Sequence, residues 1–152
     1  MGIAEKDPPR GWPRLSVSIA CRRAAEEIDF LRRAFGFEVQ LEVKGEGGRV
    51  QHAELVLGGA LVTLGDVDRG RAWRKSPLDL GGANTQACCL YVDDVDAHCA
   101  RARAAGAVID AEPKTTDHGE GYWVDRSYCA IDPEGHHWWF MQRLGEHPRG
   151  GR

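Results

Sequence analysis

Hydrophobic and polar residues alternate along several short stretches of the chain, a pattern typical of β-strands that bury one face. In residues 15–21 every second residue is apolar, and the residues between them are small or polar. From residue 24 to residue 35 the apolar residues recur at the spacing of an amphipathic helix, and Gly36 supplies its C-terminal stop. Three strands are predicted after this helix, at residues 37–43, 50–57 and 60–65.

The same order of elements returns in the second half of the chain. Asp93 and Asp94 offer side-chain caps to a second helix, and Gly106 ends it. Gly36 and Gly106 lie 70 positions apart, which indicates an internal duplication of a strand-helix-three-strand unit. The elements predicted here are a strand at 87–92, a helix at 95–105, strands at 107–111 and 122–131, and a polar loop at 113–121 between those two strands.

The final strand follows a sequence that specifies a tight turn. Pro133 fixes φ near the value that a turn needs, and Gly135 tolerates a positive φ, so residues 132–135 are predicted to join two strands. Alternation in the strand after the turn gives both of its faces large side chains. His137, Trp139 and Met141 share one face, and Trp138 and Phe140 share the other.

These elements predict an α+β fold of two tandem βαβββ units. A four-stranded sheet with one helix across it leaves one face bare, so two units would line a concave cup of the kind in which ligands bind. Trp73, in the connecting loop, is either a packing anchor or a lid residue. We expect a mobile tail at 1–13, the first unit at 14–65, a connecting loop at 66–85, the second unit at 86–143 and a mobile tail at 144–152.

Composition narrows the classes of function. A chain of 152 residues suits a single domain, and a net charge of −3 with both signs spread along it gives no basic surface for nucleic acid. The N-terminal residues lack the apolar run of a signal peptide, and no stretch is long enough to span a bilayer, so we expect a cytoplasmic protein. The five cysteines match no zinc motif and are expected to be buried thiols.

The turn at 132–135, the duplication and the helix entry at 92–95 together resemble the vicinal-oxygen-chelate superfamily, which comprises glyoxalase, bleomycin-resistance and extradiol-dioxygenase proteins. The resemblance spans residues 15–143 and implies two curved mixed sheets around a ligand cup. The segments at 34–36, 52–55 and 135–139 are most similar to the branch labelled glyoxalase-like or PhnB-like.

The resemblance also implies where a metal would bind, because metal-dependent members place ligands on the first and last strands of each unit. The corresponding positions are Ser16, Thr63, Ala87 and Trp139, and Gln86 lies one residue from the third. Only the Gln86 amide could coordinate a metal, and a single amide oxygen cannot hold a transition metal against water. We therefore expect no metal site, with Trp139 standing where relatives usually carry a glutamate.

His52 and Glu54 form a polar pair two residues apart on one strand, so they share a face. If that face lines the cup, the pair could bind a polar group of a ligand, or Glu54 could orient His52 for acid-base chemistry. Alternatively, the pair lies on an outer face or at a subunit contact, because alternation alone does not say which face is open to solvent. His98 and His118 are expected to face solvent.

Aromatic residues near the last strand supply the other candidate site. Trp139 could stack on a flat ligand, and ordinary core packing is the alternative interpretation for each of its aromatic neighbours. The ligand-binding residues predicted from the sequence are Trp139, His52, Glu54, Tyr122, Trp123, Arg126, Tyr128, His137 and Met141.

The sequence leaves two main hypotheses for the function, and a third one besides. The first is a metal-free binder without cofactor, similar to the bleomycin-resistance branch, which works as a homodimer and sequesters an aromatic antibiotic or related natural product. The alternative is a glyoxalase-like lyase or dioxygenase, either dependent on a divalent metal or using His52 and Glu54 as an acid-base pair. The third is a dimeric scaffold whose cup holds no ligand.

Overall fold

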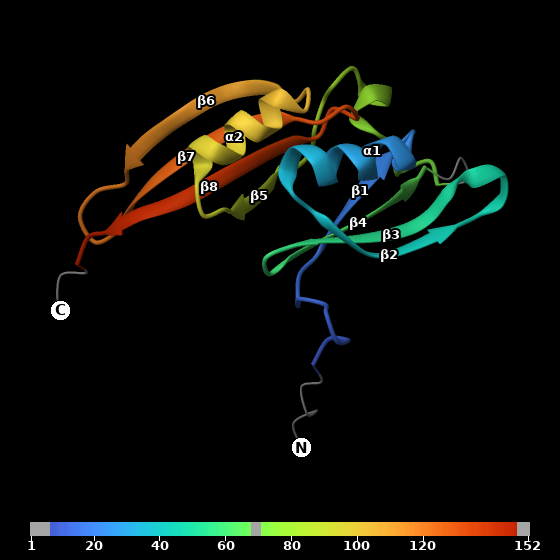
Figure 1. Cartoon of the computed structure of the whole chain (residues 1–152), viewed down its shortest axis with the longest axis horizontal. Coiled ribbons are helices and arrows are strands. Elements are labelled where there is room, and N and C mark those ends of the chain that lie inside the picture. The colour runs from blue at the N-terminus through green and yellow to red at the C-terminus, as the bar shows by residue number, and fades with distance from the viewer. Residues whose placement is uncertain (1–6, 68–70, 149–152) are drawn as a thin grey trace.

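The described residues of the computed structural model, 7–67 and 71–148, form two four-stranded sheets. Figure 1 shows the sheets side by side, with helices α1 and α2 on one side of them. Each sheet therefore has one face covered by a helix and one face without a helix. The predicted α+β fold of two βαβββ units is confirmed.

The first sheet has the strand order β1-β4-β3-β2, with β1 parallel to β4 and the other pairs antiparallel. The predicted helix is one continuous element in two parts, an α-helix followed by a π-helical turn that ends at Gly36 with φ 84°. The elements are β1 (Val17–Cys21), α1 (Ala24–Phe30), η1 (Leu31–Phe35), β2 (Glu38–Lys44), η2 (Glu46–Gly48), β3 (Val50–Leu57) and β4 (Ala60–Asp66).

The second sheet repeats this arrangement with the order β5-β8-β7-β6 and β5 parallel to β8. Its helix begins at the predicted cap, where the Asp94 carboxylate accepts a hydrogen bond from the Ala97 N–H at 3.0 Å. The elements are β5 (Cys88–Tyr91), α2 (Val95–Ala104), β6 (Val108–Asp117), β7 (Trp123–Ile131) and β8 (His137–Glu146), preceded in the connecting loop by η3 (Pro77–Leu80).

Two boundaries of the second unit differ from the prediction. Strand β6 continues through Pro113 to Asp117, so the loop expected at 113–121 begins later. A proline is tolerated there because β6 is an edge strand and its register with β7 shifts between Ala111 and Lys114. Strand β8 extends to Glu146, three residues past the expected end of the unit. The mobile tails expected at 1–13 and 144–152 fall in part on residues 1–6 and 149–152, which lie outside the described residues.

One core joins the two halves, because η1 of the first half packs against β8 of the second. The Phe35 ring lies 5.5 Å from Trp138 and 4.7 Å from Phe140, measured between ring centroids, and all three side chains are fully buried. Tyr128 of β7 stacks on Phe140 at 5.3 Å. Burying aromatic side chains of this size is among the largest stabilising contributions available to a small domain.

The turn between β7 and β8 links the halves a second time. The Asp132 carboxylate accepts hydrogen bonds from the Glu134 and His136 backbone N–H groups and, at 2.7 Å, from the Trp138 indole. The Glu134 carboxylate in turn accepts the Arg22 and Arg23 backbone N–H groups at 2.9 and 2.8 Å, just before α1. A turn of the second unit therefore holds the backbone that leads into the first unit's helix, and it places negative charge near the helix N-terminus, where such charge is favourable.

Glu27 of α1 lies buried beside this turn, and neither of its carboxylate oxygens accepts a hydrogen bond from a donor. Burial, followed by the negative charge of Asp132 close by, raises the pKa of Glu27 to about 10. Glu27 is therefore protonated at neutral pH, and its carboxyl O–H can donate a hydrogen bond to Asp132.

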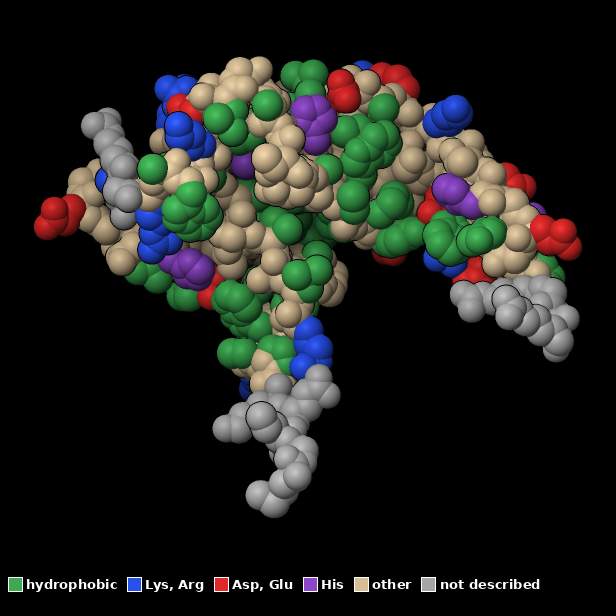
Figure 2. All heavy atoms as spheres, turned by 180° about the vertical axis from the view of Figure 1, so that it is seen from behind, with side chains coloured by type: hydrophobic (Ala, Val, Ile, Leu, Met, Phe, Trp, Pro, Cys, Tyr) green, Lys and Arg blue, Asp and Glu red, His purple; other side chains and the backbone are tan. Residues whose placement is uncertain are grey.

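The helix-free faces of the two sheets form the underside of the molecule. Figure 2 shows the chain from behind as an arch that is hollowed beneath. We refer to these helix-free faces as the open faces and to the opposite ones as the covered faces. Within the described residues, no helix is both long and apolar enough to cross a membrane.

Candidate functional site

The open face of the second sheet carries Trp139 at its centre. The register places Cys89 of β5, Trp139 of β8 and Cys129 of β7 side by side, and Met141 lies two residues further along β8. The Trp139 side chain is 37% exposed, whereas its neighbour Trp138 on the covered face is fully buried. An indole on this face is free to contact a molecule from outside the chain.

A second group of side chains lies toward the far end of the same face. The Asp125 carboxylate accepts hydrogen bonds from the Tyr91 hydroxyl at 2.9 Å and the Trp123 indole at 2.8 Å. The Arg143 guanidinium forms an ion pair with Asp125 at 3.3 Å and lies 5.0 Å from the centre of the Trp123 ring. Tyr122, Trp123 and Arg143 also line a cavity of about 600 Å³. The sequence analysis predicted Tyr122 and Trp123 as ligand contacts, but it did not predict their charged neighbours Asp125 and Arg143.

Two predicted ligand contacts lie on the covered face instead. Tyr128 has no exposed surface, and its hydroxyl is hydrogen-bonded to the His98 ring at 2.6 Å. Arg126 forms a two-point ion pair with Asp96 of α2, at 2.9 and 2.8 Å. Alternation along β7 turns both residues away from the face that carries Trp139, so neither lines the same surface as that indole.

The histidines also differ in environment. The expectation that His98 faces solvent is wrong, because its ring is held between the Tyr128 hydroxyl and, at 2.9 Å, the Phe35 carbonyl. Burial lowers the pKa of His98 and favours its neutral form. His118 is exposed, as expected. His137 shares the face of Trp139, with its Nε2 atom 3.9 Å from an Asp110 carboxylate oxygen.

His52 and Glu54 lie on the open face of the first sheet, together with Thr63 and Ser18, and not on the face that the helix covers. The Glu54 carboxylate accepts a hydrogen bond from the Gln40 amide at 2.8 Å and is 3.1 Å from His52 Nε2. Burial alone would raise the pKa of Glu54, but hydrogen bonds from Gln40, His52 and Trp12 together hold it below its usual value. Glu54 is therefore an ionised carboxylate that orients the imidazole of His52.

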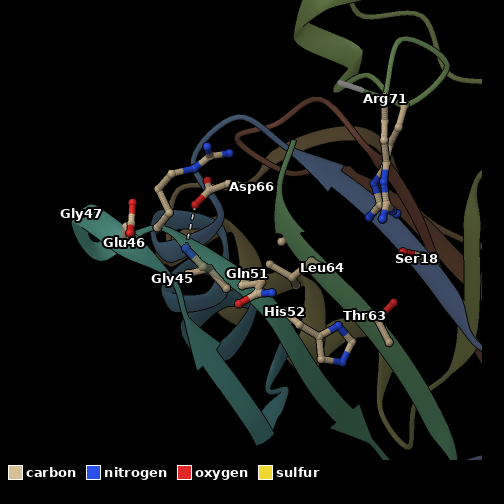
Figure 3. A pocket seen from close by; sticks show the side chains of 14 residues that line it. Ser18, Gly45, Glu46, Gly47, Gln51, His52, Thr63, Leu64, Asp66 and Arg71 are labelled. Carbon is tan, nitrogen blue, oxygen red and sulfur yellow. Dashed lines mark hydrogen bonds between the residues drawn. The ribbon is translucent and has the colours of Figure 1, made fainter. Parts of the chain in front are cut away.

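The same open face leads into a cavity of about 960 Å³ at the end of the sheet that holds η2 (Figure 3). His52 lines this cavity, and the hydroxyl-bearing residues Ser18 and Thr63, which are register partners on β1 and β4, lie in its floor. The connecting loop contributes Arg71 and Arg74. The sequence showed this loop only as rich in Gly, Asp and Arg, and gave no sign that it returns over the sheet.

The structure does not gather all the predicted residues into one site. His52 and Glu54 belong to the first sheet, whereas Trp139, Trp123 and Met141 belong to the open face of the second. Within the part of the chain that the structure describes, no hydrogen bond or ring contact joins the two groups. Trp73 is 78% exposed, so it does not serve as a packing anchor for the described residues.

The residues at the family's metal positions do not fit a metal ion. Two of the four positions expected for the ligands, Ser16 and Ala87, lie just before β1 and β5. On the open faces, the register instead pairs Ser18 with Thr63 and Cys89 with Trp139. Hydroxyl groups and an indole are not the imidazole and carboxylate ligands that zinc, iron or manganese take, and Cys89 alone offers a single thiol on a different sheet from Ser18 and Thr63. Gln86 is exposed, and its amide oxygen accepts a hydrogen bond from Thr85. Among residues 7–67 and 71–148, no three His, Cys, Asp or Glu side chains converge as a metal centre requires.

The fold and the two open faces define a protein built on a duplicated βαβββ unit with a ligand-accessible concave side. Residues 15–140 match the model of the glyoxalase/bleomycin resistance protein/dioxygenase superfamily, so the chain belongs to that superfamily. A comparison with curated proteins found no match.

Several solved structures share the fold. TioX from Micromonospora sp. ML1 is 29% identical over 86% of this chain and 95% of its own, with a TM-score of 0.65. TnmS3, an antibiotic binding protein from Streptomyces sp. CB03234, is 25% identical over 83% of this chain and 91% of its own, with a TM-score of 0.59. FosX, a fosfomycin resistance protein from Listeria monocytogenes, shows likeness of fold alone, at 12% identity over 86% of this chain and 89% of its own, with a TM-score of 0.57.

Proposed function

We propose that this protein binds a planar aromatic small molecule, an antibiotic or a related natural product, without transforming it. The observation that carries the proposal is the exposed indole of Trp139 on the open face of the second sheet, at the strand position where metal-dependent relatives carry a ligand. An aromatic side chain there offers a flat apolar surface for stacking and no coordinating atom. The likeness to the antibiotic binding protein TnmS3 supports the same conclusion.

The surroundings of Trp139 suit a ligand that is bound by noncovalent contacts and is not chemically converted. Met141 adds a deformable apolar side chain on the same strand, and Trp123 adds a second indole further along the face. Such a surface gives affinity through apolar burial and ring stacking, while a few polar groups fix orientation. Asp125 and Arg143, which flank Trp123, provide those polar groups.

We further propose that the protein works as a homodimer and belongs to the glyoxalase-like, PhnB-like branch of its superfamily. No helix of the described chain covers either open face, and β2 exposes Leu41 and Val43 on the open face of the first sheet. A second copy would cover part of this apolar surface and close a groove around the ligand.

The test is a titration of planar aromatic antibiotics by calorimetry, with the wild type and the Trp139→Ala variant. We expect binding to weaken at least about tenfold in this variant, because the stacking surface is lost. Trp73→Ala is the matched control, since Trp73 is an exposed indole on the connecting loop. Equal affinities in the wild type and Trp139→Ala, or no binding of any tested compound, would contradict the proposal.

A second candidate function rests on the hydrogen-bonded pair of His52 and Glu54. An ionised carboxylate 3.1 Å from an imidazole is the arrangement of an oriented general base, so a lyase or similar acid-base reaction on the first sheet is the alternative. Metal analysis of protein purified without chelator separates the two functions. A stoichiometric divalent ion that is lost in both His52→Ala and Glu54→Ala would favour a metal-dependent enzyme over the binder.

A further inference from the structure

Three arginines from two separate segments face the large cavity of the first sheet. Arg49 lies between η2 and β3, and Arg71 and Arg74 lie in the connecting loop after β4. Figure 3 shows the Arg71 side chain extending from that loop toward Ser18 and Thr63 on the sheet. Cationic groups therefore approach the same space from above a floor of hydroxyl groups.

Two of these guanidiniums are held in place by backbone carbonyl groups. Arg74 donates a hydrogen bond from Nη2 to the Ile19 carbonyl at 2.9 Å, and Arg49 donates one from Nη2 to the Val67 carbonyl at 3.1 Å. Each contact uses a single donor atom, so the remaining N–H groups of the guanidinium can serve a ligand. A guanidinium fixed in this way loses less conformational entropy when it binds one.

The positive charge of the cavity is not balanced by ion pairs. Within the described residues, Arg49, Arg71 and Arg74 form no salt bridge. Two acidic side chains also line the cavity. Both carboxylate oxygens of Asp66 already accept backbone hydrogen bonds, from Ala24 and Val50, and Glu46 is an exposed residue of η2. Among the described residues that line the cavity, three guanidiniums and two carboxylates leave an excess of one positive charge.

The floor of the cavity adds neutral hydrogen-bonding groups. Ser18 and Thr63 are direct register partners on the parallel strands β1 and β4, so their side chains lie next to each other on the open face. His52 lines the same cavity beside them. Hydroxyl groups beside guanidiniums form a common arrangement for holding carboxylate, sulfonate or phosphonate oxygens.

We infer that this cavity is a binding site for the oxyanion group of an organic acid, recognised by Arg71 and Arg74 with Ser18 and Thr63. A volume of about 960 Å³ is far larger than an inorganic anion needs, so the oxyanion belongs to a molecule with an organic body. This site goes beyond the proposed function, because it lies on the first sheet and shares no lining residue with the face of Trp139.

The experiment compares two fluorescent probes of similar shape and different charge. The probes are 8-anilinonaphthalene-1-sulfonate, an aromatic anion, and N-phenyl-1-naphthylamine, its neutral counterpart without the sulfonate. We expect the anion to bind more tightly, and its dissociation constant to rise about tenfold in Arg71→Gln and in Arg74→Gln, because a charge-assisted hydrogen bond is lost. Affinity for the neutral probe should change less than about twofold.

Lys75→Gln is the matched control, since Lys75 is an exposed cation of the same loop that does not line the cavity. Arg71→Gln decides the test if Arg74→Gln loses stability, because Arg71 is exposed and donates no hydrogen bond to the sheet. Equal affinity for the two probes, or an equal loss in Lys75→Gln and Arg71→Gln, would overturn the inference. An arginine-dependent preference for the anion that persists in Trp139→Ala would support this site even if the proposed aromatic site fails.

Discussion

Trp138 and Trp139 are neighbours in sequence and lie on opposite faces of the second sheet. Trp138 has no exposed surface, packs against Phe35 and Phe37, and donates its indole N–H to Asp132. Trp139 lies on the open face and is 37% exposed. The same residue type therefore supports the fold at one position and remains available to a ligand at the next.

The difference between Trp138 and Trp139 reflects a difference between the two faces of the sheet. The covered face carries the aromatic core, which joins the two halves of the chain together with the hydrogen-bonded turn. On the open face, Trp139 and Met141 keep part of their side chains exposed. Substitutions on the covered side should therefore cost stability and spare ligand binding, and substitutions on the open face should do the reverse.

The largest expected effect is the difference in stability between two variants, in which Trp138 or Trp139 is exchanged for alanine. Trp138→Ala is expected to lower the free energy of unfolding by about 3–5 kcal/mol, because it leaves a cavity in the core and removes the indole donor from one oxygen of the Asp132 carboxylate. Trp139→Ala should cost less than about 1 kcal/mol, because its side chain is partly exposed. Urea denaturation followed by circular dichroism measures both, and similar losses in the two variants would refute the contrast between the faces.

An intermediate effect is expected at Glu27, on the covered side. Its pKa is raised to about 10 in the folded protein, above the usual value of 4.5 for an unfolded chain. The stability that this carboxyl contributes is therefore fully present below pH 4.5 and is lost as the pH rises toward 10. Glu27→Gln should raise the free energy of unfolding at pH 8 by about 2 kcal/mol, because glutamine stays neutral.

The measurement is the free energy of unfolding at several pH values between 5 and 9. The wild type should lose stability across this range, and Glu27→Gln should lose much less. Glu26→Gln is the control, since Glu26 is an exposed neighbour on α1 that is paired with Arg23. A wild-type stability that does not change with pH in this interval would show that Glu27 is ionised in the folded state.

The smallest effect is expected at Arg126, which was predicted to contact a ligand and instead pairs with Asp96 on the covered face. Arg126→Ala should cost no more than about 1 kcal/mol, because ion pairs near the surface contribute little to stability. It should leave the affinity for an aromatic ligand unchanged. Thermal denaturation and calorimetry with the same compounds check both statements, and a loss of affinity like that of Trp139→Ala would place Arg126 in the binding site after all.

Local sequence patterns predicted the fold well because each βαβββ unit is built from local signals. Alternation, helical spacing and glycine stops such as Gly36 are fixed by backbone geometry within a few residues. The boundary of β6 was missed because Pro113 normally ends a strand, and only its place at a sheet edge makes it acceptable. His98 was misplaced because contacts with β7 and η1, far away in sequence, determine its burial.

For the candidate site residues, too, local patterns predicted some features and contacts distant in sequence fixed the others. Alternation along a single strand was enough to predict that Trp139 shares a face with Met141 and that His52 shares one with Glu54, because it needs no knowledge of the neighbouring strands. Long-range packing, in contrast, places the two pairs on different sheets, turns Tyr128 toward the core, and brings Arg71 and Arg74 over the first sheet. Those positions depend on how strands and loops distant in sequence pack together, and that packing is fixed by the burial of the whole core.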